Sequence, residues 1–326
     1  MILALETSCD DTCAALVGED ASVHASVVSS QEVHERFGGV VPEVAARHHV
    51  ELIDVVINEA FARAGAGLEE VSLVAATRGP GLVGALLVGF CAAKGFAAAR
   101  ELPFAAVDHL HGHVAAAYLK PACFEPPFVA LIASGGHTLL LDVPERRAPM
   151  EVLARTLDDA AGEAFDKGAR MLGLGYPGGA ALSRLAAGGD GSAFEFPTGR
   201  GEDFSFAGLK TALLYKLREV DGSDETVRAN LAASFEHAIV EALVRRVLRG
   251  LERSGRSRLA LGGGVAANRT LRARLAGLGV ELFLPPIELC TDNAAMIAAA
   301  ALELEALPYP DYLDLDVYAT GEGPLR

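Results

Sequence analysis

Positive charge is scarce in this sequence of 326 residues, where 28 lysines and arginines stand against 43 aspartates and glutamates and give a formal net charge of -15. Affinity for a phosphate backbone comes mainly from Lys and Arg side chains that neutralise it. The charge balance therefore argues against a free-standing nucleic-acid binder. An RNA substrate would need a local basic patch or a basic partner.

Cysteine is also sparse, with no CxxC pair and no dense disulfide framework, at Cys9, Cys13, Cys91, Cys123 and Cys290. This distribution of cysteines is more typical of a protein in the reducing cytosol than of a secreted one, and it does not match the cysteine spacing of a zinc ribbon. Met1 leads directly into an apolar strand, which leaves no room for a secretory segment. We therefore expect a cytoplasmic protein.

A long uninterrupted apolar run is missing as well. The longest, Leu82 to Ala99, is broken by Lys94 and is rich in Gly and Ala. A bilayer span needs about 20 apolar residues with few or no charges. The run predicts a buried helix, and no membrane partner is expected.

What is abundant describes a compact α/β protein: 51% of the residues are hydrophobic, 22% are charged, and Ala and Gly are frequent. A chain of this length favours two lobes over one. The hydrophobic periodicity supports this, because strand-strand-strand and then alternating helix and strand occur twice. The first set of strands and helices is expected at 2–8, 13–17, 22–30, 42–64, 72–77, 82–99 and 104–107. The second set is expected at 127–133, 138–143, 152–156, 160–172, 180–187, 209–218, 225–253, 258–261, 269–278, 280–284 and 293–306.

This duplication predicts two similar α/β lobes that face each other across a cleft, with strand-end loops lining it. We place the first lobe at residues 1–125 plus 293–326 and the second at 126–292. Residues 187–203 show no period and are expected to form a surface loop.

Three polar loops follow strand-like runs: Glu6–Thr12, Ser134–Thr138 and Gly262–Asn268. Such loops present backbone N–H groups to phosphate or ribose, so together they indicate a nucleotide site. The second loop is equally typical of a tight hairpin turn, although His137 beside two glycines slightly favours a ligand. The third is equally typical of a strand-to-helix turn, and it lacks the full GxGxxG spacing of a dinucleotide site.

His109 and His113 are four residues apart, which puts both on one face of a helix at a separation that suits a metal. The alternative is that one histidine caps the helix and the other is half-buried on it. Asp292, just before the last expected helix, is a candidate third ligand and equally a candidate helix cap. Leu110 occupies the place of the glutamate in the H-E-x-x-H motif, so this is not a zincin site.

Three further segments carry candidate ligand contacts. Asp158 and Asp159 are explained as caps of the helix that follows them. Asp166 is not explained in this way, so a ligand hydroxyl is a reasonable partner for it. Tyr176–Gly179 is a turn whose backbone could face a ligand, and Asn268 is either a helix cap or a base and ribose contact.

Taken together, these segments closely resemble the tRNA N6-adenosine threonylcarbamoyltransferase family, once described as O-sialoglycoprotein endopeptidases. The family belongs to the actin/hexokinase/heat-shock ATPase superfamily, whose fold has two α/β lobes. The resemblance spans nearly the whole chain and rests on Glu6–Thr12, Gly38–Glu43, Gly79–Leu82, His109–His113, Ser134–Thr138, Asp158–Lys167, Tyr176–Gly179, Asp203–Phe206, Gly208–Thr211, Gly262–Leu271 and Cys290–Asn293.

The resemblance implies transfer of a threonylcarbamoyl group from threonylcarbamoyl-AMP to the N6 amine of the adenosine beside the anticodon, position 37, in tRNAs that read codons beginning with A. It implies one divalent metal, iron or zinc, on His109, His113 and Asp292. Asp10 and Asp11 would lie near the adenylate, or ATP, which would be held by Ile132, Ala133, Ser134, Gly135, Gly136, Asp166, Gly179 and Asn268.

The resemblance also implies three partners: tRNA, a paralogous dimerisation subunit and a small ATPase. The expected helix at 42–64 is a candidate interface. One departure concerns the middle of the histidine motif, where the family usually carries Glu and this chain has His111. That places any role of the carboxylate in doubt and leaves both outer histidines intact.

The spacing singles out no general base, since Asp10, Asp11, His137 and a hydroxide on the metal are all conceivable. Two alternative functions stay open on the residues alone. One is a small-molecule kinase or ATPase of the same superfamily, and the other is a non-catalytic nucleotide-binding scaffold. A glycoprotease is a poor fit, because the chain has no H-E-x-x-H base.

Overall fold

The first sheet has five strands in the order β3-β2-β1-β4-β5. Strands β1, β2 and β3 form an antiparallel meander, and β4 and β5 continue the sheet parallel to β1. The computed structural model describes residues 1–199, 201–220 and 224–319. The strands are β1 (Ile2–Glu6), β2 (Asp11–Val17), β3 (Val23–Ser30), β4 (Leu73–Gly79) and β5 (Phe104–Asp108).

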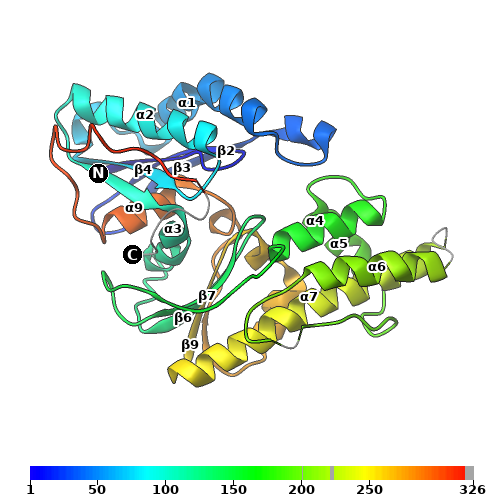
Figure 1. Ribbon diagram of the computed structural model, residues 1–326. Helices are drawn as coiled ribbons and strands as arrows, with labels where there is room; N and C mark the ends of the chain where they lie inside the picture. Colours follow the sequence, from blue (N-terminus) through cyan, green and yellow to red (C-terminus); the bar gives the residue numbers. More distant parts are fainter. Residues whose placement is uncertain (200, 221–223, 320–326) are drawn as a thin grey trace. The chain divides into compact units, whose positions relative to one another are not determined.

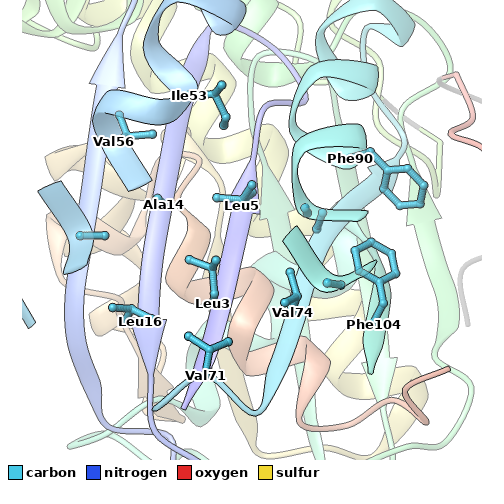
Figure 2. Close-up of a cluster of buried hydrophobic side chains, with 14 of the residues drawn as sticks. Leu3, Leu5, Ala14, Leu16, Ile53, Val56, Val71, Val74, Phe90 and Phe104 are labelled. Carbon is cyan, nitrogen blue, oxygen red and sulfur yellow. The ribbon is translucent and has the colours of Figure 1, made fainter. Parts of the chain in front are cut away.

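Two long helices, α1 (Pro42–Ala64) and α2 (Val83–Ala99), lie side by side on one face of this sheet (Figure 1). Pro42 begins α1 because its fixed φ suits the first helical position, where its missing N–H has no helical partner to lose. Figure 2 shows Ile53 of α1 and Phe90 of α2 in one buried cluster with Leu3 and Leu5 of β1. The second face of the sheet is covered by the fully apolar helix α9 (Ala294–Ala301), which packs on α3 (His109–Ala115).

The second sheet repeats this topology. Its order, β8-β7-β6-β9-β10, again places an antiparallel meander beside two parallel strands, with β6 in the place of β1. The strands are β6 (Phe128–Ala133), β7 (Thr138–Val143), β8 (Glu151–Arg155), β9 (Arg258–Gly262) and β10 (Glu281–Phe283). The expected α/β class and the internal duplication are thereby confirmed.

Within the described residues, five helices accompany this sheet, and four of them, α4 to α7, lie together in Figure 1. They are α4 (Ala161–Met171), α5 (Gly178–Ala186), α6 (Ala207–Glu219), α7 (Glu225–Ser254) and α8 (Arg269–Ala276). Short 3-10 helices complete the described chain: η1 (Glu32–Phe37), η2 (Leu68–Glu70), η3 (Ala116–Tyr118), η4 (Gly264–Ala267) and η5 (Ile287–Leu289).

The chain divides into two compact units, each built on one sheet. Unit 1 comprises Met1–Pro126, Glu145–Pro149 and Pro285–Arg326, of which residues 320–326 lie outside the described part. Unit 2 comprises Pro127–Pro144 and Met150–Leu284. This division assigns residues 285–292 to unit 1. No helix in the described residues is both long and apolar enough to cross a membrane.

Within each unit, the polar loops leave the sheet at one edge. Strands β1, β4 and β5 are parallel, so their carboxyl ends meet, and the loop after β4 approaches so closely that the amide of Leu82 donates to the carbonyl of Ser8 (2.8 Å). In unit 2, β6 and β9 are parallel with Ile132 opposite Gly262. The loops that follow them therefore emerge together, as ligand-binding loops do in α/β sheets.

Two local expectations are wrong. Helix α9 ends at Ala301 and not at residue 306, because the chain then turns and buries Glu303, whose Oε1 pairs with Nη1 of Arg146 (2.5 Å). Asp158 does not cap α4. It accepts hydrogen bonds from the amide of Phe206 (2.7 Å) and the hydroxyl of Ser205 (2.6 Å), just before α6. The expected loop at 187–203 contains no helix or strand in its described residues, and Arg200 lies outside them.

The core of unit 1 contains one unsatisfied hydroxyl, and we expect Tyr312→Phe to raise the free energy of unfolding by about 1 kcal/mol. The Tyr312 side chain is fully buried against Phe104, with ring centroids 5.2 Å apart, and its hydroxyl has no hydrogen-bond partner among the described residues. Chemical denaturation measures the effect. Tyr309→Phe, at a residue that is 41% exposed, serves as the control and should change stability by less than about 0.5 kcal/mol. A loss of stability in Tyr312→Phe would contradict the prediction.

Candidate metal and nucleotide site

Helix α3 places His109 and His113 on one face, as their spacing predicts. Their rings lie 4.8 Å apart between centroids, and both residues are buried. The helix begins directly after β5, where Asp108 caps it by accepting hydrogen bonds from the amides of Leu110 (2.9 Å) and His111 (3.0 Å). Because Asp108 supplies the cap, the alternative of a capping histidine is wrong.

Asp292, two residues before the start of α9, lies beside both histidines. Its Oδ1 lies 3.3 Å from Nε2 of His113 and 3.5 Å from Nε2 of His109. The cap of α9 is Asn293, which accepts a hydrogen bond from the amide of Met296 (2.9 Å). Asp292 is therefore not the helix cap, and its carboxylate is directed to the two imidazoles.

The donor set fits a metal ion. One ligand atom from each of His109, His113 and Asp292 lies within 4.8 Å of the others. Metal–ligand bonds near 2.1 Å in a tetrahedral site place ligand atoms about 3.4 Å apart, which agrees with the two distances to Asp292. In addition, both ring nitrogens of His113 are buried and have no hydrogen-bond partner among the described residues. A metal bond would satisfy one of them.

Glu6 provides a buried carboxylate that contacts Nδ1 of His109, the ring nitrogen that does not face Asp292. Oε2 of Glu6 lies 3.0 Å from Nδ1 of His109, and Glu6 also accepts hydrogen bonds from Oγ1 of Thr77 (2.5 Å) and the amide of Ser8. Burial alone would lower the pKa of His109, but the charges of Asp292 and Glu6 outweigh it and raise the pKa to about 9. Burial also opposes ionisation of Glu6, and the partner His109 nevertheless holds the Glu6 pKa below its usual value. An imidazole held by a carboxylate is typical of metal-binding histidines.

We expect Glu6→Gln to weaken Zn(2+) binding by about 10- to 100-fold. The amide has one acceptor atom in place of two, so it cannot satisfy Thr77 and Ser8 while orienting the His109 ring. Competition with a chromogenic chelator measures the affinity. Glu19→Gln changes an exposed carboxylate of the same unit and should leave the affinity unaltered. Equal affinity of Glu6→Gln and the parent protein would refute the supporting role.

Asp10 and Asp11 are expected near the adenylate. Asp11 is the first residue of β2, at the same edge of the sheet, and Asp10 directly precedes it. Burial and the nearby charge of Asp292 raise the pKa of Asp11 to about 7, although Asp11 accepts a hydrogen bond from the hydroxyl of Ser30 (2.5 Å). A carboxyl group with a pKa near the working pH is suited to proton transfer. The backbone carbonyl of Asp10 accepts a hydrogen bond from the amide of Gln31 (3.2 Å).

In metal-free protein, we expect Asp11→Asn to become progressively more stabilising as pH rises from 4 to 8. The folded state keeps Asp11 protonated up to about pH 7, whereas the unfolded chain ionises near 3.8. Between these values the unfolded state binds fewer protons, so wild-type stability falls as pH rises, and the amide removes this loss. The gain should be on the order of 2 kcal/mol at pH 8, after allowance for partial exposure, and near zero at pH 4. Thermal unfolding in EDTA at both pH values measures it, and a pH-independent difference would contradict the assignment.

In unit 2, the Ser134–Thr138 segment forms the hairpin turn between β6 and β7. The amide of Ser134 donates to the carbonyl of His137 (2.8 Å), and the amide of His137 donates to Oγ of Ser134 (3.1 Å). Ile132 and Ala133 are buried in the strand, whereas Gly135 and Gly136 are exposed at the tip. The turn is thus both a hairpin and a source of accessible backbone amides.

The other expected adenylate residues gather on the elements beside this turn. Oδ1 of Asp166 accepts a hydrogen bond from the amide of Gly179 (3.1 Å), which joins α4 to the start of α5. The carbonyl of Ser134 accepts a hydrogen bond from the amide of Gly162, at the start of α4 (3.0 Å). Asn268 caps α8 by accepting a hydrogen bond from the amide of Leu271 (2.8 Å), which bears out the cap interpretation. Unit 2 therefore contains all eight residues expected to hold the adenylate, and unit 1 contains the three expected metal ligands together with Asp10 and Asp11.

The sequence is similar to a family of known proteins over most of its length. Residues 22–299 match the model of the tRNA N6-adenosine threonylcarbamoyltransferase family. A curated relative of that name from Thermotoga neapolitana is 48% identical over 328 residues, which is 97% of this chain and 98% of the relative. One from Thermosipho melanesiensis is 45% identical over 93% of this chain and 94% of the relative. The chain belongs to the tRNA N6-adenosine threonylcarbamoyltransferase family. As a member of this family, it is an acyltransferase.

Solved structures resemble the chain in fold alone. Component A of (R)-2-hydroxyglutaryl-CoA dehydratase from Acidaminococcus fermentans superposes with a TM-score of 0.56 at 16% identity, over 92% of this chain and 96% of that one. HypF from T. kodakarensis gives a TM-score of 0.63 at 14% identity, over 92% of this chain and 47% of that one. The fold of this chain is therefore shared with both structures over 92% of its length.

Sequence reasoning assigned no role to Glu6, Ser8 or Thr77. Glu6 is the last residue of an apolar strand, and it is fully buried. A carboxylate at the end of an otherwise apolar strand was the available signal, because a buried acid requires a partner. That partner, His109, is more than a hundred residues away in sequence.

Proposed function

We propose that this protein transfers the threonylcarbamoyl group from threonylcarbamoyl-AMP to the N6 amine of adenosine 37 in tRNAs that read codons beginning with A. The observation that carries the proposal is the cluster of the buried His109 and His113 with the half-buried Asp292 in a chain of this family. An aromatic amine is a weak nucleophile, so an activated mixed anhydride is a chemically suitable donor for it.

One divalent ion, iron or zinc, is proposed on His109, His113 and Asp292. When bound, such an ion acts as a Lewis acid and stabilises negative charge that develops on a carbonyl or phosphate oxygen. Glu6 orients the His109 ring toward the ion, and the half-buried Asp292 supplies the negative ligand. Three protein ligands leave a coordination position for substrate.

The adenylate is proposed to lie against unit 2. The exposed amides of Gly135 and Gly136 suit a phosphate or ribose oxygen, because backbone N–H groups in such turns bind anions. Asp166 fixes the amide of Gly179 and orders the start of α5. Ile132, Ala133, Ser134 and Asn268 complete the proposed adenylate contacts, and ATP is the alternative ligand.

Among the three candidate bases, Asp10, Asp11 and His137, we favour Asp11. Its pKa of about 7 lets it accept a proton at physiological pH and release it again. In the proposed reaction the N6 amine forms a bond to the carbamoyl carbon, the bond from that carbon to the AMP phosphate oxygen breaks, and the amine proton passes to the base. AMP leaves with the electron pair of the broken bond.

The tRNA is proposed to bind with the help of other proteins in the cytoplasm, because the net charge of -15 opposes a polyanion. A paralogous dimerisation subunit and a small ATPase are the proposed partners. Helix α1 offers a surface for such a subunit, since Val50 and Val55 are 64% and 58% exposed.

The test is a transfer assay with purified protein, threonylcarbamoyl-AMP, tRNA and the two partner proteins, with the modified adenosine measured by mass spectrometry. We expect the modified nucleoside and stoichiometric AMP. Phosphoryl transfer from ATP to a small molecule without modified tRNA would favour the kinase alternative. Modification that persists undiminished when both His109 and His113 are replaced by Ala would favour the scaffold.

A further inference from the structure

Glu236 is a buried carboxylate of α7 that faces hydroxyl and amide donors and no cation among the described residues. Only 6% of the residue is exposed. Oε1 accepts hydrogen bonds from Oγ of Ser183 (2.6 Å) and Nδ2 of Asn268 (2.7 Å), and Oε2 accepts one from Oγ1 of Thr270 (2.7 Å). One side chain thus ties α5 to Asn268 and the first turn of α8.

These contacts fix the orientation of the Asn268 amide. Nδ2 of Asn268 donates to Oε1 of Glu236 and lies 3.1 Å from Oγ of Ser183, while Oδ1 accepts from the amide of Leu271. Glu236 and Ser183 are hydrogen-bonded to each other (2.6 Å), so both acceptors lie on the same side of Nδ2 and share one of its two N–H groups. The donor side and the acceptor side of the Asn268 amide are thereby fixed by contacts within the protein.

We propose that Glu236 is a positioning residue of the nucleotide site, which holds the Asn268 amide in a single orientation toward the adenosine moiety. This inference rests on the proposed function, because it takes Asn268 as an adenylate contact. An acceptor is required opposite Nδ2 of Asn268, because this nitrogen can only donate, whereas the hydroxyls of Ser183 and Thr270 can donate or accept. Removing that acceptor would leave the Asn268 amide without the contact that fixes its orientation.

The experiment compares AMP affinity, measured by calorimetry, between the full-length protein and Glu236→Leu. The variant keeps a side chain of similar size but leaves Nδ2 of Asn268 without its carboxylate acceptor. We expect AMP to bind at least 10-fold more weakly, with the Zn(2+) content unchanged. The matched control is Glu241→Gln, which removes the pairing of α7 with Arg274 of α8 (2.7 Å) without touching Asn268. This control should alter AMP affinity by less than twofold.

A second pair of variants distinguishes a positioning role of Glu236 from a general effect on the stability of the fold. Asn268→Asp keeps the cap on Leu271 but sets two carboxylates against each other in the presence of Glu236. In the double variant, Glu236→Gln with Asn268→Asp, the glutamine amide can donate to the new carboxylate, so donor and acceptor are exchanged. We expect the double variant to bind AMP at least fivefold more tightly than Asn268→Asp alone.

Unchanged AMP affinity in Glu236→Leu, an equal loss in Glu241→Gln, or strictly additive effects in the double variant would each overturn the positioning role. A wild-type protein that binds no AMP would overturn the proposed function itself, and the inference with it. Wild-type binding with a selective loss in Glu236→Leu and rescue in the double variant supports both.

Discussion

His113→Ala is expected to abolish retention of the metal ion and to reduce threonylcarbamoyl transfer at least about 100-fold. His113 is one of three ligand side chains, and its buried ring nitrogens have no partner among the described residues that could compensate. Removal leaves His109 and Asp292, and two ligands hold a divalent ion far less firmly than three. Metal content by mass spectrometry after desalting, together with the transfer assay, measures both effects.

The matched control for this variant is His111→Ala, on the same helix. His111 lies outside the cluster formed by His109, His113 and Asp292, so the metal content should stay at wild-type level. Thermal unfolding of both variants in EDTA checks that the folded unit survives. Full metal occupancy in a folded His113→Ala protein would remove this residue from the metal site.

Gly263→Ala is expected to destabilise unit 2 by about 3 kcal/mol or more and to abolish nucleotide binding. Gly263 has φ of +86°, which L side chains rarely adopt, and an added Cβ would lie 2.6 Å from the carbonyl carbon of Ala133 and even closer to its oxygen. The contact is with backbone, so it cannot be relieved by a side-chain rotation. Relief would move the turn after β9 away from the end of β6.

Gly208→Ala is the matched control for the glycine substitution. Its Cβ would meet nothing within 4 Å, and the residue lies in α6, where alanine is favoured over glycine by about 0.5–1 kcal/mol. Denaturant unfolding and AMP calorimetry measure both variants. If Gly263→Ala were as stable as Gly208→Ala and bound AMP normally, the close approach of the two strand ends would not be essential.

The sequence predicted the duplicated topology because each copy alternates apolar strands and amphipathic helices with a clear period. It also predicted that His109 and His113 share a helix face, since four residues span about one turn. The third member, Asp292, was proposed as a ligand while capping remained open. Only the structure separates the two, because Asn293 has the backbone position of the cap.

Side-chain contacts between segments far apart in the sequence could not be predicted from the sequence. Asp158 has the typical position of a cap for α4, yet its carboxylate bonds to the start of α6, nearly fifty residues later. Glu236 lies in the middle of a long helix, where a charged residue is ordinarily solvated, and no pattern reveals that Ser183 and Thr270 converge on it. Periodicity reports which face of a helix is apolar and does not report which polar groups meet.

The repeated strand order has a consequence for how such a molecule can change. In each copy, the ladder of strand hydrogen bonds is complete before the loops at its carboxyl edge begin. One copy carries imidazoles and carboxylates there, and the other carries two exposed glycines between Ser134 and His137. A few substitutions in the loops of either half can therefore introduce new catalytic or binding residues, while the strands and helices of both halves stay the same.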